Sequence, residues 1–185
     1  MRIGGGALKG RRVHVPRGTR PTQERVRAAI FNMLQDRVRG AQVLDLFAGT
    51  GSLGLEALSR GADRAVFVEQ DPRAVRALRA NITKSGLQAR AEVIATDVRR
   101  AVPVLARRGE TFDLVLLDPP YGTGLAQRTV EAIARLGLLR PGGMIVAETG
   151  AHEAIRPPEG YEVVRDRTYG DTRITVLVRS WGGPG

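Results

Sequence analysis

The stretch VLDLFAGTGSLG, residues 43–54, contains the elements that decide the fold. Its first four residues form a short, mostly apolar run, which is typical of a buried strand. Gly49, Gly51 and Gly54 follow with the spacing GxGxxG, and an apolar helical pattern begins at Leu53. Glu69 lies 20 residues after Gly49, at the end of the next apolar run. A strand, a glycine loop and a helix in this order predict the nucleotide-binding unit of an open α/β sheet.

Beyond this unit, apolar runs typical of strands alternate with segments of helical periodicity. The predicted strands are residues 42–46, 65–68, 92–95, 112–117 and 144–148, and the predicted helices are residues 53–59, 72–85, 98–107 and 127–136. Two further β-rich runs, separated by a turn at 169–171, fill residues 161–178. The alternation favours an α/β fold with a mostly parallel sheet and helices on both faces. The last two runs predict one antiparallel hairpin at an edge of the sheet.

The first 39 residues differ from the rest of the chain in charge. They contain ten Lys or Arg and two acidic residues, whereas the remaining residues contain 19 basic and 17 acidic ones. Most of the net charge of +10 therefore lies in this segment. Residues 11–16 alternate like a strand, and a helical pattern then continues until Gly40 ends it. We divide the chain into a basic extension, residues 1–39, built from a hairpin and a helix, a cofactor-binding domain, residues 40–179, and a tail, residues 180–185.

A concentrated set of cations predicts a polyanionic partner, and nucleic acid is the simplest one. A compositional preference for Arg over Lys is the alternative explanation, but it does not account for the clustering. The candidate RNA-binding residues are Arg2, Lys9, Arg11, Arg12, Arg17, Arg20, Arg25 and Arg27.

The composition excludes several kinds of site and location. The chain has no cysteine, which rules out disulfides, thiolate–zinc sites and cysteine nucleophiles. His14 and His152 are far apart in the sequence, so we expect no metal centre. No apolar run approaches the ~18 residues of a membrane span, and the N-terminus lacks the apolar stretch of a secretory signal. We therefore expect a cytoplasmic protein without a membrane partner and, since nothing indicates association, a monomer.

Asp45 indicates which cofactor the glycine loop binds. It lies four residues before Gly49, and its carboxylate would repel the pyrophosphate of a dinucleotide. S-adenosylmethionine (SAM) carries a positive sulfonium and a positive amino group instead. Glu69 can accept hydrogen bonds from ribose hydroxyls, and Asp97 is expected near the adenine amino group. The alternatives are that Asp45 closes the loop and that Asp97 caps the helix after it. The candidate cofactor-binding residues are Asp45, Phe47, Ala48, Gly49, Gly51, Glu69, Gln70, Asp97, Val98 and Asp118.

The predicted fourth strand ends in the sequence DPPY, residues 118–121. Chemistry in open α/β sheets gathers at the carboxyl ends of strands, next to the cofactor. An exocyclic amine on a base is a poor nucleophile, because its lone pair is delocalised into the ring. Asp118 and the Pro119 carbonyl could accept its two hydrogens and free that lone pair, Pro120 would restrain the backbone, and Tyr121 could stack on the base. Such a site acts on a base that has been turned out of its stack. We take Asp118, Pro119, Pro120 and Tyr121 as the candidate catalytic residues.

The glycine loop and DPPY together resemble the class I amino-methyltransferases, and the N-terminal block narrows the resemblance to the RsmD family. That block appears here as Gly4-Gly5, Gly10-Arg11-Arg12, Arg20-Pro21-Thr22, Arg25-Val26-Arg27 and Phe31-Asn32, and it is joined by DLFAGTGSLGLEALSRGA, residues 45–62, and by Tyr169-Gly170-Asp171-Thr172. The resemblance implies a Rossmann-like, seven-stranded class I methyltransferase sheet with an N-terminal RNA-binding extension. It also implies methylation of a guanine N2 in 16S ribosomal RNA, on assembled or nearly assembled small subunits.

Two other functions remain open on the residues alone. Adenine-N6 and protein-glutamine methyltransferases have a similar four-residue motif, usually with Asn first, and only the family resemblance favours guanine over these amines. An NAD-linked oxidoreductase could use Gly49, Gly51, Gly54 and Glu69, but the sequence offers no evident proton-transfer pair for it, and Asp45 argues against it.

Overall fold

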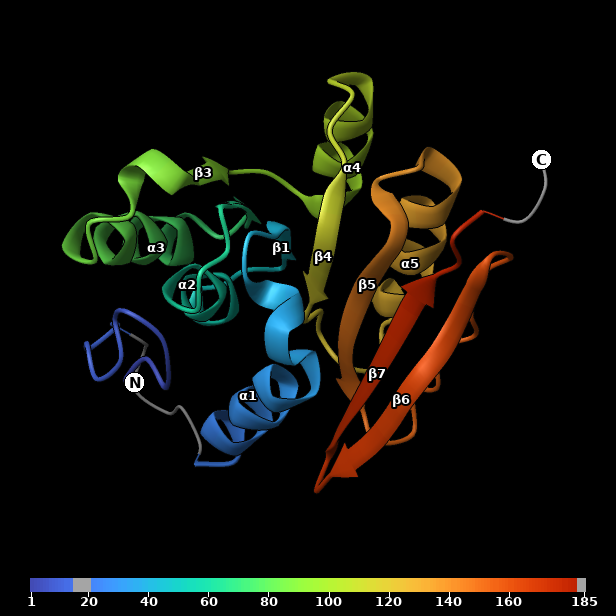
Figure 1. Ribbon diagram of the computed structural model, residues 1–185, viewed down its shortest axis with the longest axis horizontal. Helices are drawn as coiled ribbons and strands as arrows, with labels where there is room; N and C mark the ends of the chain where they lie inside the picture. Colours follow the sequence, from blue (N-terminus) through green and yellow to red (C-terminus); the bar gives the residue numbers. More distant parts are fainter. Residues whose placement is uncertain (15–20, 183–185) are drawn as a thin grey trace.

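The computed structural model describes residues 1–14 and 21–182. Its centre is a seven-stranded sheet with the order β3-β2-β1-β4-β5-β7-β6 (Figure 1). The strands are β1 (Gln42–Leu46), β2 (Arg64–Val68), β3 (Ala91–Ile94), β4 (Phe112–Leu117), β5 (Leu139–Gly150), β6 (Tyr161–Tyr169) and β7 (Thr172–Arg179). Strands β1 to β5 pair in parallel, and β7 pairs antiparallel with both β5 and β6. The predicted mostly parallel sheet with one antiparallel edge hairpin is confirmed.

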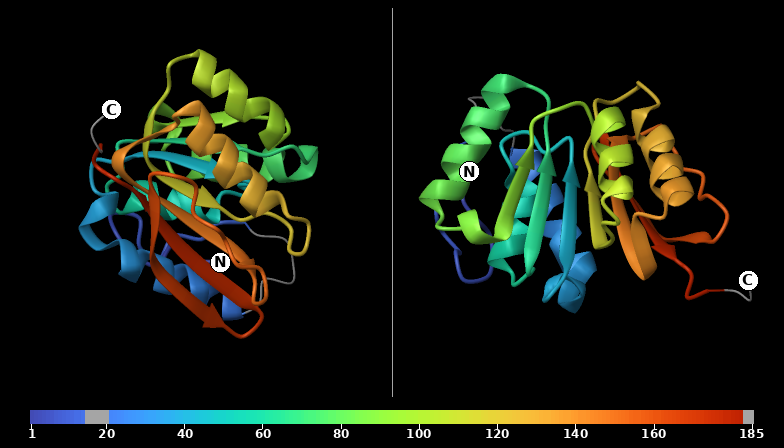
Figure 2. Two further views of the ribbon diagram at one scale, coloured as in Figure 1. Left: turned by 90° about the vertical axis from the view of Figure 1, so that its right-hand side faces the viewer. Right: turned by 90° about the horizontal axis from the view of Figure 1, so that it is seen from above.

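Helices cover both faces of the sheet (Figure 2). They are α1 (Pro21–Leu34), α2 (Ser52–Ser59), α3 (Pro72–Lys84), α4 (Val98–Arg107) and α5 (Leu125–Leu136), with short 3-10 helices η1 (Gln35–Val38) and η2 (Gln88–Arg90). Buried side chains of α1, α2 and α3 form one apolar cluster with alternate strand residues such as Val43. Those of α4 and α5 form a second cluster with the intervening residues, such as Leu44. The strands are therefore buried on both sides, as expected for a parallel sheet. No helix in the described part of the chain has both the length and the apolar character needed to cross a bilayer.

Strand β5 is longer than the sequence indicates. The predicted strand is residues 144–148, after a turn at Pro141-Gly142-Gly143, but β5 already begins at Leu139. The pairing with β4 jumps from Phe112–Leu139 to Leu114–Met144. The proline and glycines thus form an irregular insertion within the strand rather than a turn before it, because a bulge lets a strand absorb unpaired residues.

The N-terminal residues fold against α2. Arg2 and Arg12 form an isolated antiparallel bridge, and the Val13 amide donates to the Met1 carbonyl. Residues 1–13 thus fold back on themselves in antiparallel fashion, with one bridge between their two ends. The Gly4 amide donates to the Glu56 carboxylate of α2, while Ile3 and Val13 are buried in the same apolar cluster as α1, α2 and α3.

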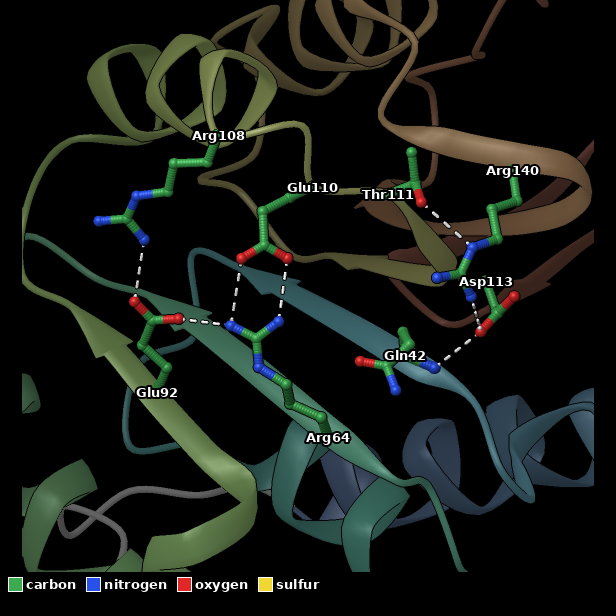
Figure 3. Close-up of polar contacts among 8 residues, drawn as sticks. All are labelled: Gln42, Arg64, Glu92, Arg108, Glu110, Thr111, Asp113 and Arg140. Carbon is green, nitrogen blue, oxygen red and sulfur yellow. Dashed lines mark hydrogen bonds and ion pairs between the residues drawn. The ribbon is translucent and has the colours of Figure 1, made fainter.

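A network of ion pairs joins elements at the amino-terminal ends of the parallel strands (Figure 3). Arg64, at the start of β2, contacts Glu92 of β3 at 2.6 Å and Glu110, before β4, at 2.9 Å. Arg108, after α4, contacts Glu92 at 3.0 Å. Ion pairs as well as strand pairing therefore hold the amino-terminal ends of these strands together.

The strand order reverses between β1 and β4, and the carboxyl ends of the parallel strands meet at this point. The chain runs from β1 outward to β3 and then crosses back to β4, so the carboxyl ends of β1 and β4 lie side by side. Leu46 pairs with Leu117 at this point. Ligands of open α/β sheets bind in the crevice outside the strands at such a reversal.

Candidate active site

Four residues form a row at or near the carboxyl ends of four strands. Leu46 pairs with Val68 and with Leu117, and Leu117 pairs with Ala147. The next residue on each strand lines one cavity of about 680 Å³, and these residues are Phe47, Glu69, Asp118 and Glu148. The other lining residues are Gln23, Val26, Val68, Gln70, Thr96, Val98, Pro119, Pro120, Tyr121, Gly170, Asp171 and Thr172. This row results from the parallel pairing of the strands. Residues that follow paired positions on neighbouring parallel strands lie side by side, even where they are far apart in sequence.

The glycine loop opens onto a smaller cavity of about 280 Å³, which shares Phe47, Asp118 and Glu148 with the larger one. Ala48 and Gly49 line it, as expected for candidate cofactor-binding residues. Phe47 and Gly49 both have a φ of 58°, an uncommon backbone conformation for a phenylalanine. A Cβ built on Gly49 would meet no atom within 4 Å. The loop backbone is therefore accessible to a ligand at Gly49. Gly51, by contrast, is buried, and a Cβ there would lie 2.4 Å from Leu78.

Asp45 lies beneath the loop and lines neither cavity. Its side chain is buried, and one carboxyl oxygen accepts a hydrogen bond from the Gly54 amide at 3.0 Å. Burial raises the pKa of Asp45 to about 7, against the opposing effect of the Gly54 hydrogen bond, and the charge of Glu69 raises it further. The contact is the loop-closing one that the sequence left as the alternative, since the carboxyl satisfies an amide of the first turn of α2.

Glu69 and Asp97 also make backbone contacts. The Glu69 carboxylate accepts hydrogen bonds from the amides of Gly49, Gln70 and Asp71, each at 2.8 Å, and it faces the cavity together with Gln70 and Val98. Asp97 is the N-cap of α4 and accepts the Arg99 amide at 2.8 Å.

The Arg99 guanidinium also pairs with Asp97 and lowers the pKa of that carboxyl to about 2. Asp97 lines a separate hollow beside the main cavity, together with Thr96 and Gln70. The helix-cap alternative for Asp97 is thus the contact that the structure contains.

Asp118, which is exposed, and Glu148, which is half-buried, are neighbouring carboxyl groups that line the main cavity. They follow the paired residues Leu117 and Ala147, so they occupy adjacent positions on β4 and β5. Loss of hydration among the surrounding protein atoms raises the pKa of both groups. The neighbouring charges of Glu148 and Asp45 raise that of Asp118 further. Because Leu117 and Ala147 are paired, the two carboxyl groups follow at neighbouring positions, and charging both of them is unfavourable.

Tyr121 stands beside this pair and is held by two hydrogen bonds. Its hydroxyl donates to Glu148 at 3.1 Å and lies 2.8 Å from the Thr172 hydroxyl. Burial, with smaller contributions from the charges of Glu148 and Asp118, raises the pKa of the phenol. The residue is 43% exposed, so part of it remains available for contact. Pro119 is buried and Pro120 is exposed, and the Pro120 carbonyl accepts a hydrogen bond from Thr123.

The main cavity is acidic. Among the described residues that line it, four are Asp or Glu, namely Glu69, Asp118, Glu148 and Asp171, and none is Lys, Arg or His. A pyrophosphate would meet net repulsion there, whereas a ligand with a sulfonium and an ammonium group would be attracted. The residues thus fit a cationic cofactor, although the carboxyl that prompted this expectation, Asp45, is buried behind the wall.

The candidate RNA-binding residues divide into three groups. Arg2, Lys9, Arg12 and Arg27 line one shallow hollow next to α1 and α2. Arg11 and Arg25 are exposed, and the Arg11 guanidinium donates to the Lys84 carbonyl. Arg17 and Arg20 lie outside the described residues.

Arg27 differs from the exposed Arg11 and Arg25 in its surroundings. Its side chain is buried, and its guanidinium donates to the Arg2 carbonyl at 2.6 Å and contacts the Met1 sulfur. A buried cation needs hydrogen-bond partners, and Arg27 finds them in Met1 and Arg2. These contacts attach the N-terminus to α1.

Sequence reasoning missed Glu148, Gln23 and the hairpin residues that line the cavity. Glu148 was detectable in principle, since it ends the predicted strand 144–148 just as Asp118 follows 112–117. Gln23 reaches the cavity from α1, and Gly170, Asp171 and Thr172 reach it from the β6–β7 turn. Their position depends on how α1 and the edge hairpin pack, which no local pattern indicates.

The comparisons with known proteins agree with this architecture. The model of the family described as conserved hypothetical protein 95 matches residues 1–178. YlbH of Bacillus subtilis is 36% identical, over 95% of this chain and 97% of its own. The Escherichia coli protein named ribosomal RNA small subunit methyltransferase D is 34% identical, over 99% of this chain and 92% of its own.

A solved structure of yhhF from Escherichia coli superposes with a TM-score of 0.88 at 33% identity, over 98% of this chain and 99% of that one. The family model spans nearly the whole chain, and the alignments with relatives above 30% identity cover almost all of this chain and of each relative. This chain therefore belongs to the family described as conserved hypothetical protein 95, which is the RsmD family.

Proposed function

We propose that this RNA methyltransferase of the RsmD family, which uses SAM, methylates the exocyclic N2 amine of a guanine in 16S ribosomal RNA. Its relative in Escherichia coli carries the name ribosomal RNA small subunit methyltransferase D. The proposed partner is the 16S RNA of the assembled or assembling small subunit, with the chain acting as a monomer in the cytoplasm.

One observation carries the proposal. Asp118 and Tyr121 lie in an acidic cavity at the point where the strand order reverses, and the glycine loop opens onto the same space through the shared residues Phe47 and Asp118. A cationic methyl donor over the loop and a base against Tyr121 would therefore meet at Asp118. The lack of cations among the described lining residues disfavours the NAD-linked alternative, because a pyrophosphate would gain no counter-charge there.

Each residue of the motif has a distinct task in this proposal. Asp118 accepts a hydrogen bond from the target amine and thereby directs the nitrogen lone pair toward the methyl group. The Pro119 carbonyl accepts the second amine hydrogen, and Tyr121 stacks on the base. SAM supplies an electrophilic methyl group: the nitrogen lone pair forms the N–C bond, and the C–S electrons return to sulfur, giving neutral S-adenosylhomocysteine. The nitrogen then loses one proton, which a carboxylate of the cavity or water accepts.

The direct test is methylation of small subunits that lack the modification, with labelled SAM, followed by location of the label. We expect one labelled guanine, with the methyl group on N2. A label on adenine N6, or on a protein glutamine, would replace the proposed substrate with one of the other amines. Thermal unfolding tests the cofactor separately: S-adenosylhomocysteine should raise the midpoint and NAD should not.

The role of Asp118 is tested by Asp118→Ala. The variant should keep the thermal stabilisation by S-adenosylhomocysteine, because the glycine loop and Glu69 are unchanged. Methyl transfer should fall about 100-fold or more, as for other lost contacts that act in the transition state. Near-normal turnover would remove Asp118 from the mechanism.

A further inference from the structure

Glu148 is the one member of the row at the strand ends that the proposed chemistry leaves without a task. It comes from β5, the neighbour of β4, and it lines both cavities. One of its oxygens accepts the Tyr121 hydroxyl at 3.1 Å. It follows Ala147, the pairing partner of Leu117, so it occupies the position next to Asp118, and both residues line the two cavities. The target base thus meets two adjacent carboxyl groups rather than one.

Two adjacent carboxyls need hydrogen-bond donors between them, because carboxylates only accept and repel each other at this distance. The raised pKa values of Asp118 and Glu148 agree with this unfavourable arrangement. A substrate that binds against both groups relieves it when it brings neighbouring donors of its own.

The purine bases differ in this respect. Guanine carries N1–H directly beside its N2 amine, so its edge offers a continuous row of donors. Adenine carries an N6 amine beside N1, which is an acceptor. Flipped bases are read through hydrogen bonds to this same edge. An acceptor at N1 would face a carboxylate and be repelled, and a site built to receive an N–H rejects an analogue that lacks it.

We propose that Glu148 is a guanine-reading residue, which accepts the N1–H of the target base while Asp118 accepts the adjacent N2 amine. The inference rests on the proposed function and deepens it, since it assigns the choice between guanine and other amines to a carboxylate outside the DPPY motif. Tyr121 donates to Glu148, so this hydrogen bond links the stacking ring to the base-reading group.

The test uses a base that keeps the reacting amine and turns the adjacent ring nitrogen from a donor into an acceptor. 2-Aminopurine has the same 2-amine, but its N1 is an acceptor, and it has no O6. Small subunits are reconstituted with 16S RNA that carries guanine or 2-aminopurine at the position located by the labelling experiment. The full-length wild-type protein should favour guanine in kcat/KM by roughly 10- to 100-fold, the effect of one hydrogen bond to a charged group.

Glu148→Gln is the decisive variant. Its amide has the same shape and can donate to the ring N1 of 2-aminopurine. We therefore expect the preference for guanine to fall to within about 3-fold, mainly through lower kcat/KM on guanine. Stabilisation by S-adenosylhomocysteine shows that the variant is folded and binds the cofactor.

Tyr121→Phe is the matched control, because it removes the hydroxyl partner of Glu148 and retains the carboxylate. It should lower kcat/KM on both bases by the same factor and leave the preference intact. If Glu148→Gln also lowers both equally, Glu148 only supports Tyr121, and the proposal fails while guanine methylation stands. Equal use of both bases by the wild-type protein would overturn it without any variant. The proposed function is decided separately, by whether the label maps to guanine N2.

Discussion

Asp45 places a titratable carboxyl beneath the glycine loop, where its charge is disfavoured. Burial raises its pKa from 3.8 to about 7, so the folded state binds a proton more tightly than the unfolded state does. Stability linked to this group is therefore present at low pH and is lost as pH rises from about 4 through 7. At about 1.4 kcal/mol per unit, the linked loss in the free energy of unfolding is at most about 4 kcal/mol.

We therefore expect Asp45→Asn to become favourable relative to wild type as pH rises. The amide oxygen can still accept the Gly54 amide, but it carries no proton to lose. Urea unfolding of both proteins between pH 4 and 8 should show the difference moving toward the variant over this range. Asp63→Asn, at an exposed position before β2, supplies the baseline. A difference that does not change with pH would mean that Asp45 is not linked to folding in this way.

Gly54 is fixed by close packing rather than by a special backbone angle. A Cβ at this position would lie 2.3 Å from the Phe67 ring and 2.9 Å from the Asp45 carboxylate. Replacing glycine by alanine inside a helix normally stabilises by up to about 1 kcal/mol. Here the clash should reverse the sign, and we expect Gly54→Ala to destabilise by about 1–3 kcal/mol.

The cause of this effect can be isolated with a double variant. Phe67 is fully buried, and Phe67→Leu shortens the side chain that the new methyl group meets. In urea unfolding, Gly54→Ala combined with Phe67→Leu should therefore be less destabilising than the sum of the two changes. Strict additivity would show that the Phe67 contact is not the obstacle.

At the scale of elements, hydrophobic periodicity and turn-forming residues were sufficient to predict nearly all strands of the sheet. Apolar runs of four to six residues, separated by helical patterns, predict β1 to β4 within one residue at each end. The exception is β5, whose Pro141-Gly142-Gly143 resembles a turn. Local signals describe backbone preference, whereas the β4 partner decides that this segment pairs.

The site was predictable where it follows a strand end and less so where it depends on packing. Phe47, Glu69 and Asp118 each follow a predicted strand, and each lines the cavity. Asp45 lies two residues before Phe47 and points beneath the loop. The sequence could not show this, because the position of the Asp45 side chain depends on the approach of the Gly54 amide. It equally could not show which face of α1 carries Arg27, whose burial depends on the N-terminal loop packing across it.

The ion-pair network at the amino-terminal edge joins β2, β3 and the segment before β4 (Figure 3). Arg64 is its centre, and the hydrogen bond to Glu110 is the largest effect that raises the pKa of Arg64. Its side chain is 34% exposed, so each pair is partly screened and contributes little by itself. We expect Arg64→Met to lower the free energy of unfolding by about 1–2 kcal/mol at low salt.

Salt separates the charge effect from a loss of packing. The deficit of Arg64→Met in urea unfolding should shrink when 1 M NaCl is present, because ions screen partly exposed pairs. Arg76→Met, at an exposed position on α3, controls for the removal of one cation from a basic protein. A deficit that is the same at both salt concentrations would assign the effect to the arginine stem instead of its charge.

For the whole molecule, the basic N-terminal loop and the acidic cavity are joined by α1. The loop packs on α2 through Gly4 and Leu8, and Arg27 of α1 ties the loop to that helix. Gln23 of the same helix lines the cavity. Phosphates held by the loop would therefore lie close to the cavity, while the acidic lining would repel the RNA backbone and admit only an uncharged base with its donor groups.

The arrangement predicts a specific dependence of RNA binding on salt. Arg11 and Arg12 are exposed on the N-terminal loop, and each phosphate contact contributes about one unit to the slope of log K against log salt. The double substitution Arg11→Gln and Arg12→Gln should thus reduce the slope for 16S RNA by about two units.

The control removes two cations from the other side of the molecule. Arg107 and Arg135 are exposed near the C-terminal ends of α4 and α5. These helices run opposite to the parallel strands, so their last turns lie at the edge away from the cavity. Arg107→Gln with Arg135→Gln should weaken binding slightly, through net charge, without changing the slope by a full unit. Equal slopes for both double variants would mean that the N-terminal arginines add general charge and contact no phosphate.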